Sequence, residues 1–349
     1  MPLRISLCPY RLLFRHPFGT AHGLRDGTDA LFIRLEEDGV VGYGEVTLPP
    51  YLTETVSDAI ERMRALAARG PWTGKALYGS INHLPEFQDP GHGCRAGLHM
   101  ALIDLIGKER QLTARELLDI PMVGDPITLM TIGISPPGEL AMKVAELPMS
   151  GALKVKVGDA AAAARIRALR SMDDRKLLLD GNQGIGSVLE AQDLVRAAGP
   201  ERVIAFEQPF PTTLDELNLV LHEATGIDVF SDESVQGLDD LRSKQHLFSG
   251  VNIKLMKCGG MDRAVALANQ ARSVGLKVML GSMCESSLGC TAMAQLITVA
   301  GIVDLDGPWL IKNDPFRGMA MEHGKVAVMN SPGLGVALVA DLQLDHIGP

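Results

Sequence analysis

Residues 153–158 read LKVKVG, and similar short β-rich segments return along the chain at intervals of 22 to 27 residues. The others are ITLMTIGI from Ile127, KLLLDGNQ from Lys176, VIAFEQP from Val203, DVFSDES from Asp228, GVNIKLM from Gly250, KVMLGSM from Lys277 and IVDLDG from Ile302. Most stretches between them have the apolar spacing of an amphipathic helix. This α/β alternation predicts a parallel (β/α)8-type barrel, because doubly wound sheets seldom keep so even a spacing and no GxGxxG motif supports a Rossmann fold.

The two ends of the chain lack this regular alternation of strand-like and helix-like segments. RISLCPYRLLF, ALFIRLEEDG and VVGYGEV alternate like antiparallel strands, with a hairpin signal at Asp38-Gly39, and two helical stretches follow before residue 122. The segment after Trp309 is again β-like. We therefore expect an α+β capping domain built from residues 1–122, a barrel from residues 123–314, and a C-terminal segment, residues 315–349, that returns to the cap.

Composition restricts the class of partner. The 349 residues are 46% hydrophobic and 21% charged with a net charge of −9, and no block of Lys or Arg is present. These values predict a small-molecule partner and exclude nucleic acid or an anionic membrane. No apolar run reaches the roughly 20 residues of a membrane span, and no secretory signal is evident, so we expect a cytoplasmic protein. The oligomeric state stays open, a homo-oligomer included.

The five cysteines are scattered and never in CxxC spacing. This pattern argues against a disulfide framework and against a zinc site, and it favours buried thiols.

Five strand-like segments place a charged residue near their C-terminal ends: Lys156, Asp180, Glu207, Asp232 and Lys254. Active sites of such barrels lie at these ends, and Lys154 shares a face with Lys156 because the two are two residues apart. A buried charge is costly unless it is paired or bound to a metal, so an internal salt bridge is the plain alternative for any single residue. Five charged residues at successive strand ends favour a reaction site over five separate salt bridges.

Three carboxylates without a nearby histidine or cysteine suit a hard divalent cation, Mg²⁺ first and Mn²⁺ second. Such a cation can stabilise the enediolate formed when a carbon acid beside a carboxylate loses its proton. Lys154 and the cation can lower the pKa of Lys156, which then acts as a base. With Lys254 across the site, the residues permit a 1,1-proton transfer that inverts a carbon centre.

The combined motifs resemble the enolase superfamily, specifically its muconate-lactonising-enzyme subgroup: KVK at 154–156, DGNQG from Asp180, FEQPF from Phe206, SDES from Ser231 and NIKLMKCGG from Asn252. The resemblance covers essentially the whole chain. It implies a modified (β/α)7β barrel with an α+β cap, Asp180, Glu207 and Asp232 as Mg²⁺ ligands, and Lys156 and Lys254 as the acid/base pair.

Residues at the end of the last predicted strand narrow the range of possible substrates. Asp304 and Asp306 place two inward carboxylates where no metal role remains, and dipeptide epimerases of the subgroup carry a similar pair for the substrate's α-ammonium group. We therefore expect epimerisation at the C-terminal residue of a dipeptide, L-Ala-D/L-Glu-like. The alternatives are a cycloisomerase, an o-succinylbenzoate synthase, an N-acylamino-acid racemase, or a non-catalytic binding protein on the same scaffold. A helix cap is the structural alternative for the pair.

The side-chain preference depends on loops and gives conflicting indications. Arg25 suits a substrate Glu side chain, although it could instead pair with its neighbour Asp26, whereas Glu285 suits a cationic substrate. The full set of expected pocket residues outside the strand ends is His22, Arg25, Tyr51, Thr131, Cys284 and Glu285.

Overall fold

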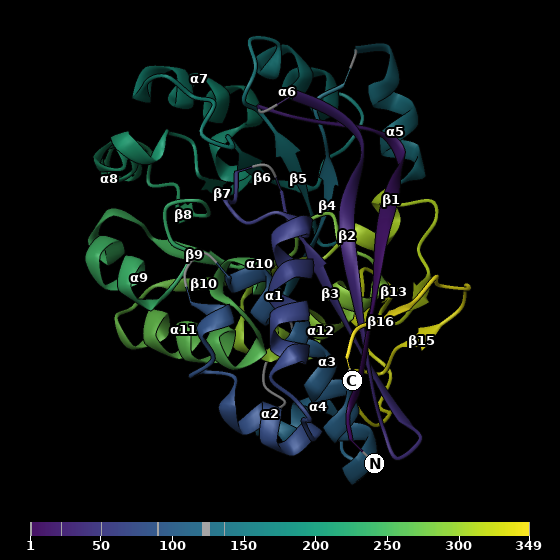
Figure 1. Ribbon diagram of the computed structural model, residues 1–349. Coiled ribbons are helices and arrows are strands. Elements are labelled where there is room, and N and C mark those ends of the chain that lie inside the picture. Colours follow the sequence, from purple (N-terminus) through teal and green to yellow (C-terminus); the bar gives the residue numbers. More distant parts are fainter. Residues whose placement is uncertain are drawn as a thin grey trace.

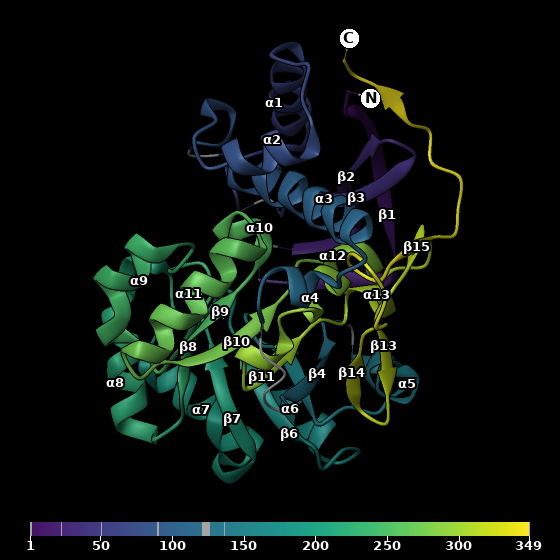
Figure 2. The ribbon, with the colours of Figure 1, turned by 90° about the horizontal axis from the view of Figure 1, so that it is seen from below.

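Eight parallel strands form the closed barrel that the repeated segments predict, in a computed structural model that describes residues 2–21, 23–49, 51–88, 91–120, 126–135 and 137–348. Helices surround the barrel (Figures 1 and 2). In hydrogen-bonded order the strands are β10 (Lys277–Gly281), β11 (Ile302–Asp304), β4 (Ile127–Ile132), β5 (Ala152–Lys156), β6 (Lys176–Asp180), β7 (Val203–Glu207), β8 (Val229–Ser231) and β9 (Gly250–Ile253).

Along the chain, at least one helix follows each of the first seven barrel strands, β4 to β10, as a (β/α)7β barrel requires. The expected modified barrel with a capping domain is therefore confirmed. The main connecting helices are α5 (Leu140–Glu146), α6 (Ala162–Arg170), α7 (Val188–Ala198), α8 (Glu216–Thr225), α9 (Leu238–Lys244), α11 (Met261–Ser273) and α12 (Ser287–Ala294), with a short α10 (Leu255–Cys258) directly after β9.

The barrel interior changes from apolar to charged within two residues along several strands. Its apolar layer contains Leu129, Ala152, Leu178, Ala205, Phe230 and Met279. Side chains two positions apart on a strand point the same way, so the next inward layer holds Thr131, Lys154, Asp180, Glu207 and Asp232. Strand periodicity thus places the charged residues together at the C-terminal end of the barrel.

The capping domain contains a four-stranded antiparallel sheet whose order is β16-β1-β2-β3. Asp38 and Gly39 both have positive φ values, 49° and 82°, as the two-residue hairpin between β2 and β3 requires. The C-terminal strand β16 pairs with β1, with Ser6 opposite His346, so the chain end returns to the cap. The sheet strands are β1 (Arg4–Thr20), β2 (Gly23–Glu37), β3 (Val40–Thr47) and β16 (Asp345–His346).

The other cap helices and C-terminal elements are α1 (Val56–Ala68), α2 (Gly74–Ser80), α4 (Ala114–Leu117), α13 (Gly307–Leu310), β12 (Phe316–Arg317), β13 (Ala320–Glu322), β14 (Lys325–Ala327) and β15 (Ala337–Leu338). The domain boundaries after residues 122 and 314 stay a prediction.

Helix α3 (His92–Arg110) lies between the cap sheet and the barrel (Figure 2). Every residue from Gly93 to Gly107 is buried, whereas three-to-four spacing of apolar residues predicts a helix with one exposed face. A Cβ added at Gly44 of β3 would lie only 1.9 Å from the Gly97 carbonyl oxygen, so this contact needs glycine. On the barrel side, Arg95 donates to both carboxylate oxygens of Asp262, at 3.0 and 2.7 Å.

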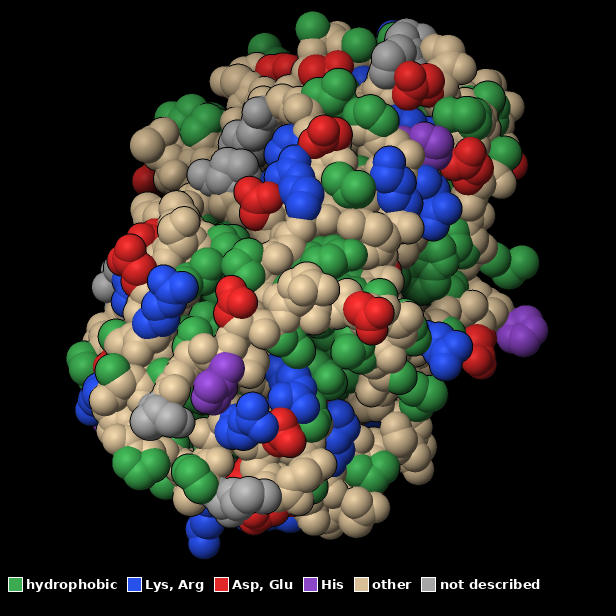
Figure 3. Space-filling model, turned by 45° about the vertical axis from the view of Figure 1, so that its right-hand side comes forward, with side chains coloured by type: hydrophobic (Ala, Val, Ile, Leu, Met, Phe, Trp, Pro, Cys, Tyr) green, Lys and Arg blue, Asp and Glu red, His purple; other side chains and the backbone are tan. Residues whose placement is uncertain are grey.

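Charges of both signs are interspersed over the face of the molecule shown in Figure 3. That face has no extended region of one sign, in keeping with the prediction of a small-molecule partner. Within the described residues, no helix combines the length and the hydrophobicity needed to cross a lipid bilayer.

A buried carboxylate of the cap joins β3 to the loop after β10. Glu45 accepts hydrogen bonds from the amides of Ser286 and Gly289, at 2.9 and 3.0 Å. Glu285, only 1% exposed, lies beside it and accepts from the Met283 amide at 2.7 Å. Burial and the charge of Glu45 raise the pKa of Glu285 to about 8, against a smaller lowering by Lys254.

This raised pKa predicts a pH-dependent stability. Unfolding returns the pKa of Glu285 to its ordinary value of 4.5, so its contribution is present below pH 4.5 and is lost as the pH rises toward 8. Glu285→Gln keeps the acceptor oxygen and removes the ionisation. We expect the variant to lose less stability than the wild type between pH 5 and 8, by roughly 1–3 kcal/mol, in urea unfolding followed by circular dichroism.

The matched control is Glu61→Gln on the exposed surface of α1. It should leave the pH profile of the free energy of unfolding unchanged. Parallel profiles for the wild type and Glu285→Gln would show that Glu285 does not titrate in this interval.

Candidate active site

An inner cavity of about 100 Å³ lies at the C-terminal ends of the barrel strands, with cap residues on its other side. It brings together residues on or just after β4, β5, β6, β8, β9, β10 and β11 with residues of the β1–β2 hairpin and of the loop after β3. Its walls include ten of the sequence-predicted residues: Arg25, Tyr51, Thr131, Lys154, Lys156, Asp232, Lys254, Cys284, Asp304 and Asp306. Asn182, which shares the inward face of Asp180, also lines it.

Lysine and carboxylate side chains pair throughout the charged layer. Lys154 lies 2.9 Å from Asp180, 2.8 Å from Glu207 and 2.7 Å from Asp304. Lys156 donates to Asp180 at 2.6 Å. All of these side chains are buried, so each charge is compensated by a partner rather than by water.

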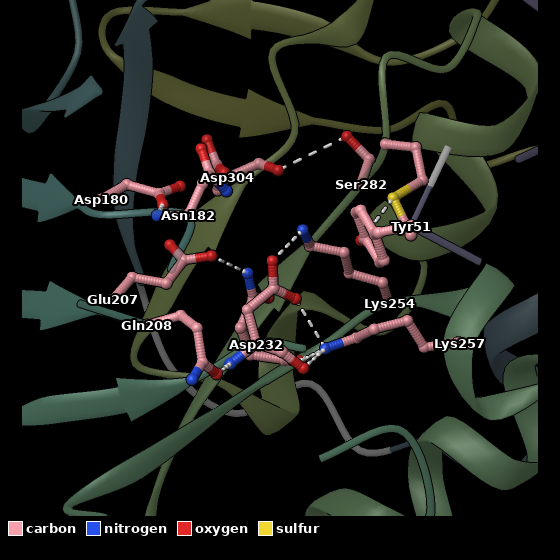
Figure 4. A network of polar contacts seen from close by, with 12 residues as sticks. Tyr51, Asp180, Asn182, Glu207, Gln208, Asp232, Lys254, Lys257, Ser282 and Asp304 are labelled. Carbon is pink, nitrogen blue, oxygen red and sulfur yellow. Dashed lines mark hydrogen bonds and ion pairs between the residues drawn. The ribbon is translucent and has the colours of Figure 1, made fainter. Parts of the chain in front are cut away.

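Asp232 has two lysine partners, and Figure 4 shows both reaching its carboxylate. Lys254 donates to one oxygen and Lys257 to the other, each at 2.7 Å. Lys257 also donates to the carbonyl oxygens of Asn252 and Val235, which fixes the turn into α10. Sequence reasoning missed Lys257, although its spacing of three residues from Lys254 is a signal that both could meet the same carboxylate.

The pKa values follow from these pairs. Burial alone would raise the pKa of Asp180, but Lys154 and Lys156 lower it to about 2. Glu207 has the opposite balance, because burial and the charge of Asp180 raise its pKa to about 7. Although burial favours a neutral amine, the carboxylates around Lys154 raise its pKa well above the usual value, and Asp232 does the same for Lys254.

Lys156 and Lys254 approach the cavity from opposite sides of the barrel. Lys156 ends β5 and Lys254 follows β9, and these strands are four apart in either direction around the eight-stranded circle. A flat reactive group between the two amines would therefore present one face to each. This arrangement can remove a proton from one side and return one from the other.

Asp304 and Asp306 lie beside β4. The Thr131 amide donates to Asp306 at 2.6 Å, and its hydroxyl donates to Asp304 at 3.3 Å. Lys154 balances the charge of Asp304, whereas Asp306 has no ion pair within the described residues. Burial and the charge of Asp304 raise the pKa of Asp306 to about 7, so a cationic ligand at this place would relieve a repulsion.

The cap contributes Arg25 and Tyr51 to the inner cavity. The segment around Arg25, expected as a loop, is part of the β1–β2 hairpin. Asp26 pairs with Arg11 at 2.8 Å and not with Arg25. The Tyr51 hydroxyl lies 3.3 Å from the sulfur of Met283, a barrel residue in the same wall. His22 lies outside the described residues.

Cys284 lines the inner cavity, and burial raises its pKa to about 11, so the thiol is neutral. Glu285 does not line the cavity, which corrects the expectation that it faces the substrate. Its carboxyl group accepts a hydrogen bond from the Met283 amide, because a buried polar group needs a partner and finds one in the backbone.

Asp180, Glu207 and Asp232 are close in the barrel, yet lysines fill the spaces between them. Asp180 and Glu207 are directly opposite each other in the register of β6 and β7. Across the described part of the chain, no group of three or more acidic, histidine or cysteine side chains is already arranged to hold a metal ion. The structure thus brings the predicted ligands together in their lysine-paired form.

Comparison with known proteins gives the family. The domain family described as mandelate racemase/muconate lactonizing enzyme, N-terminal domain, matches residues 7–119, and the enolase C-terminal domain-like family matches residues 139–342. An L-Ala-D/L-Glu epimerase of Bacteroides thetaiotaomicron is 32% identical over 336 residues, which span 96% of this chain and 88% of that protein.

Solved structures agree with the fold. A dipeptide epimerase from Cytophaga hutchinsonii, complexed with Mg and D-Ala-L-Val, superposes with a TM-score of 0.89 at 23% identity and covers 100% of both chains. A dipeptide epimerase from Methylococcus capsulatus, complexed with Mg and L-Arg-D-Lys, gives 0.84 at 27% identity over 96% of this chain and 99% of the other. The chain belongs to the mandelate racemase/muconate lactonizing enzyme family of the enolase superfamily, and it is an isomerase of the epimerase and racemase type.

Proposed function

We propose that this isomerase is a dipeptide epimerase that depends on a divalent metal, Mg²⁺ or Mn²⁺, and inverts the α-carbon of the C-terminal residue by 1,1-proton transfer. The observation that carries the proposal is the placement of Lys156 and Lys254 on opposite strands, with the Asp304–Asp306 pair beside them. The named activities of the relatives in Bacteroides thetaiotaomicron and Methylococcus capsulatus support it.

In this proposal each lysine serves one face of the substrate. One amine accepts the α-proton, and the ammonium group of the other lysine returns a proton to the opposite face. Lys154 is a supporting residue, since its charge lies next to Asp180, the partner of Lys156. The two lysines exchange roles when the other epimer is the substrate, so the site works in both directions.

Asp180, Glu207 and Asp232 would hold the metal. They fit a hard divalent cation because all three offer oxygen, and because a cation would counteract the burial and the charge of Asp180 that raise the pKa of Glu207 to about 7. A bound cation supplies the fixed positive charge that makes a carbon acid beside a carboxylate acidic enough to lose its proton. Asn252 orients Glu207, because its side-chain amide donates to Oε1 of Glu207 at 2.8 Å, while Lys154 lies next to Oε2.

The substrate amine would bind at Asp304 and Asp306. A buried aspartate pair selects a cation and rejects an acylated, neutral nitrogen. At the other end, Arg25 lines the inner cavity without a carboxylate partner within the described residues, so a C-terminal Glu side chain suits it. These features favour an L-Ala-D/L-Glu-like dipeptide over the substrates of a cycloisomerase or an N-acylamino-acid racemase.

Replacing one lysine at a time tests whether each lysine serves one face of the substrate. We expect Lys156→Ala and Lys254→Ala each to lower epimerisation of L-Ala-L-Glu by roughly 10²–10⁴-fold, because each removes one proton donor and acceptor. In D2O with Mg²⁺, each variant should still exchange the α-proton of one epimer, and the epimer should differ between the variants. NMR and mass spectrometry measure this, with the exposed Lys176→Ala as control. Equal exchange of both epimers by both variants would contradict the two-base scheme.

Asp306→Asn tests the amine site. The change keeps the shape of the side chain and removes the charge that faces the ammonium group. We expect kcat/KM for L-Ala-L-Glu to fall roughly 10- to 100-fold, mainly through KM, as is typical when a buried charge partner is lost. Asp341→Asn on the exposed C-terminal segment is the control. An unchanged kcat/KM would remove the reason for preferring a free amine.

Metal binding can be measured without turnover. After treatment with EDTA, addition of Mg²⁺ at 100 times its dissociation constant should stabilise the protein by about 2.7 kcal/mol, seen as a rise in Tm. Glu207→Gln should lose most of this rise, whereas Glu61→Gln should keep it. If neither Mg²⁺ nor Mn²⁺ changed the Tm of the wild-type protein, the proposed metal site would be wrong.

A further inference from the structure

A second, larger cavity of about 530 Å³ lies next to the inner cavity. We call it the outer cavity. It lies between β1, the end of β4, α5 and α13, and three residues, Phe18, Thr131 and Leu310, line both cavities. His16 of β1 bonds to Glu146 of α5 at 2.5 Å and so ties together two of the elements that bound it (Figure 1).

The wall between the two cavities carries the proposed amine site. Thr131 donates from its amide to Asp306 and from its hydroxyl to Asp304, and the same residue faces the outer cavity. A dipeptide whose α-ammonium group lies at this pair therefore has its N-terminal α-carbon next to the shared residues. The side chain on that carbon has the outer cavity within reach.

Size supports this assignment. Small-molecule sites usually enclose roughly 300–1,000 Å³. The inner cavity, at about 100 Å³, is well below that range, whereas the outer cavity, at about 530 Å³, lies inside it. A dipeptide with a long N-terminal side chain fits only if that side chain uses the outer cavity.

The charge of the lining selects an acidic side chain. Arg15 donates to the carbonyl oxygens of Trp309 and Ile311, and within the described residues it forms no ion pair. The Lys143 side chain is 12% exposed, and its ion-pair partner among the described residues, Glu139, is 3.3 Å away and 43% exposed. An ion pair whose carboxylate is exposed to water is weak, so the lysine charge stays available to a ligand.

The acidic residue of the lining, Glu146, already has a partner, because its carboxylate lies 2.5 Å from the His16 imidazole. The rest of the wall is largely apolar, with Phe18, Met130, Trp309 and Leu310. A ligand group with an apolar stem and an anionic tip matches this lining, and a second ammonium group does not.

We propose that the outer cavity is the subsite for the side chain of the substrate's N-terminal residue and that it prefers an acidic residue, Glu above Ala and Lys. This inference rests on the proposed dipeptide epimerase function. It extends the substrate class from L-Ala-D/L-Glu-like dipeptides to glutamyl dipeptides and assigns Lys143 and Arg15 as specificity-determining residues.

Three dipeptides with a common C-terminal residue test the proposal: L-Glu-L-Glu, L-Ala-L-Glu and L-Lys-L-Glu, each in D2O with Mg²⁺. We expect kcat/KM for L-Glu-L-Glu to exceed that for L-Lys-L-Glu by roughly 10-fold or more, a ratio typical of one unscreened charge contact. In Lys143→Met the ratio of L-Glu-L-Glu to L-Ala-L-Glu should fall roughly 10-fold. Lys143→Glu should reverse the order of L-Glu-L-Glu and L-Lys-L-Glu.

Arg15→Gln provides a second variant from another element and should shift the ratio in the same direction. Lys176→Met, an exposed lysine at the opposite end of the barrel, should leave all three ratios unchanged. If L-Ala-L-Glu exchanges deuterium but L-Glu-L-Glu has no advantage over L-Lys-L-Glu and Lys143 variants leave the ratios unchanged, the outer cavity is not this subsite. If no dipeptide exchanges, the proposed function itself is wrong.

Discussion

The three ion pairs of Lys154 are the interaction on which the barrel interior depends. The side chain is 2% exposed and joins carboxylates from β6, β7 and β11 to β5. A buried charge costs several kcal/mol unless partners compensate it, and an uncharged residue at this position would leave three anions facing one another. The ion pairs that join these strands are thus made by the same charged residues that the proposed function uses.

These charges explain why the site could be predicted from the sequence. A strand alternates with a period of two, so Lys154 and Lys156 must share a face, and Asp180 must follow the inward Leu178. Parallel strands of a barrel all end on one side, so residues far apart in the chain meet there. Because both rules are properties of the backbone, the order of residues was enough to place Glu207 and Asp232 near the lysines.

Positions beyond the strand ends do not obey these rules. Glu285 lies only four residues past β10, yet its direction is decided by the Met283 amide and by Glu45, which comes from the other domain. Likewise, Arg95 of α3 is charged yet buried, because its guanidinium pairs with Asp262 on the barrel side. Contacts between domains involve partners that no local pattern contains, so the cap is where sequence reasoning was weakest.

The division between residues at the strand ends and residues elsewhere also separates the groups proposed to react from those proposed to set specificity. The lysines and carboxylates lie on the barrel strands or within two residues of their ends, and hydrogen bonds on both sides fix the position of each strand. The proposed proton transfer needs such fixed positions. The residues proposed to meet the substrate's side chains lie elsewhere: Arg25 and Arg15 come from the β1–β2 hairpin, and Lys143 comes from a helix around the barrel strands. Substitutions there change the charge or size of a cavity without disturbing the ion pairs of Lys154. Under the proposed function, a chain of this family can therefore acquire a new dipeptide preference while the arrangement of its two lysines stays intact.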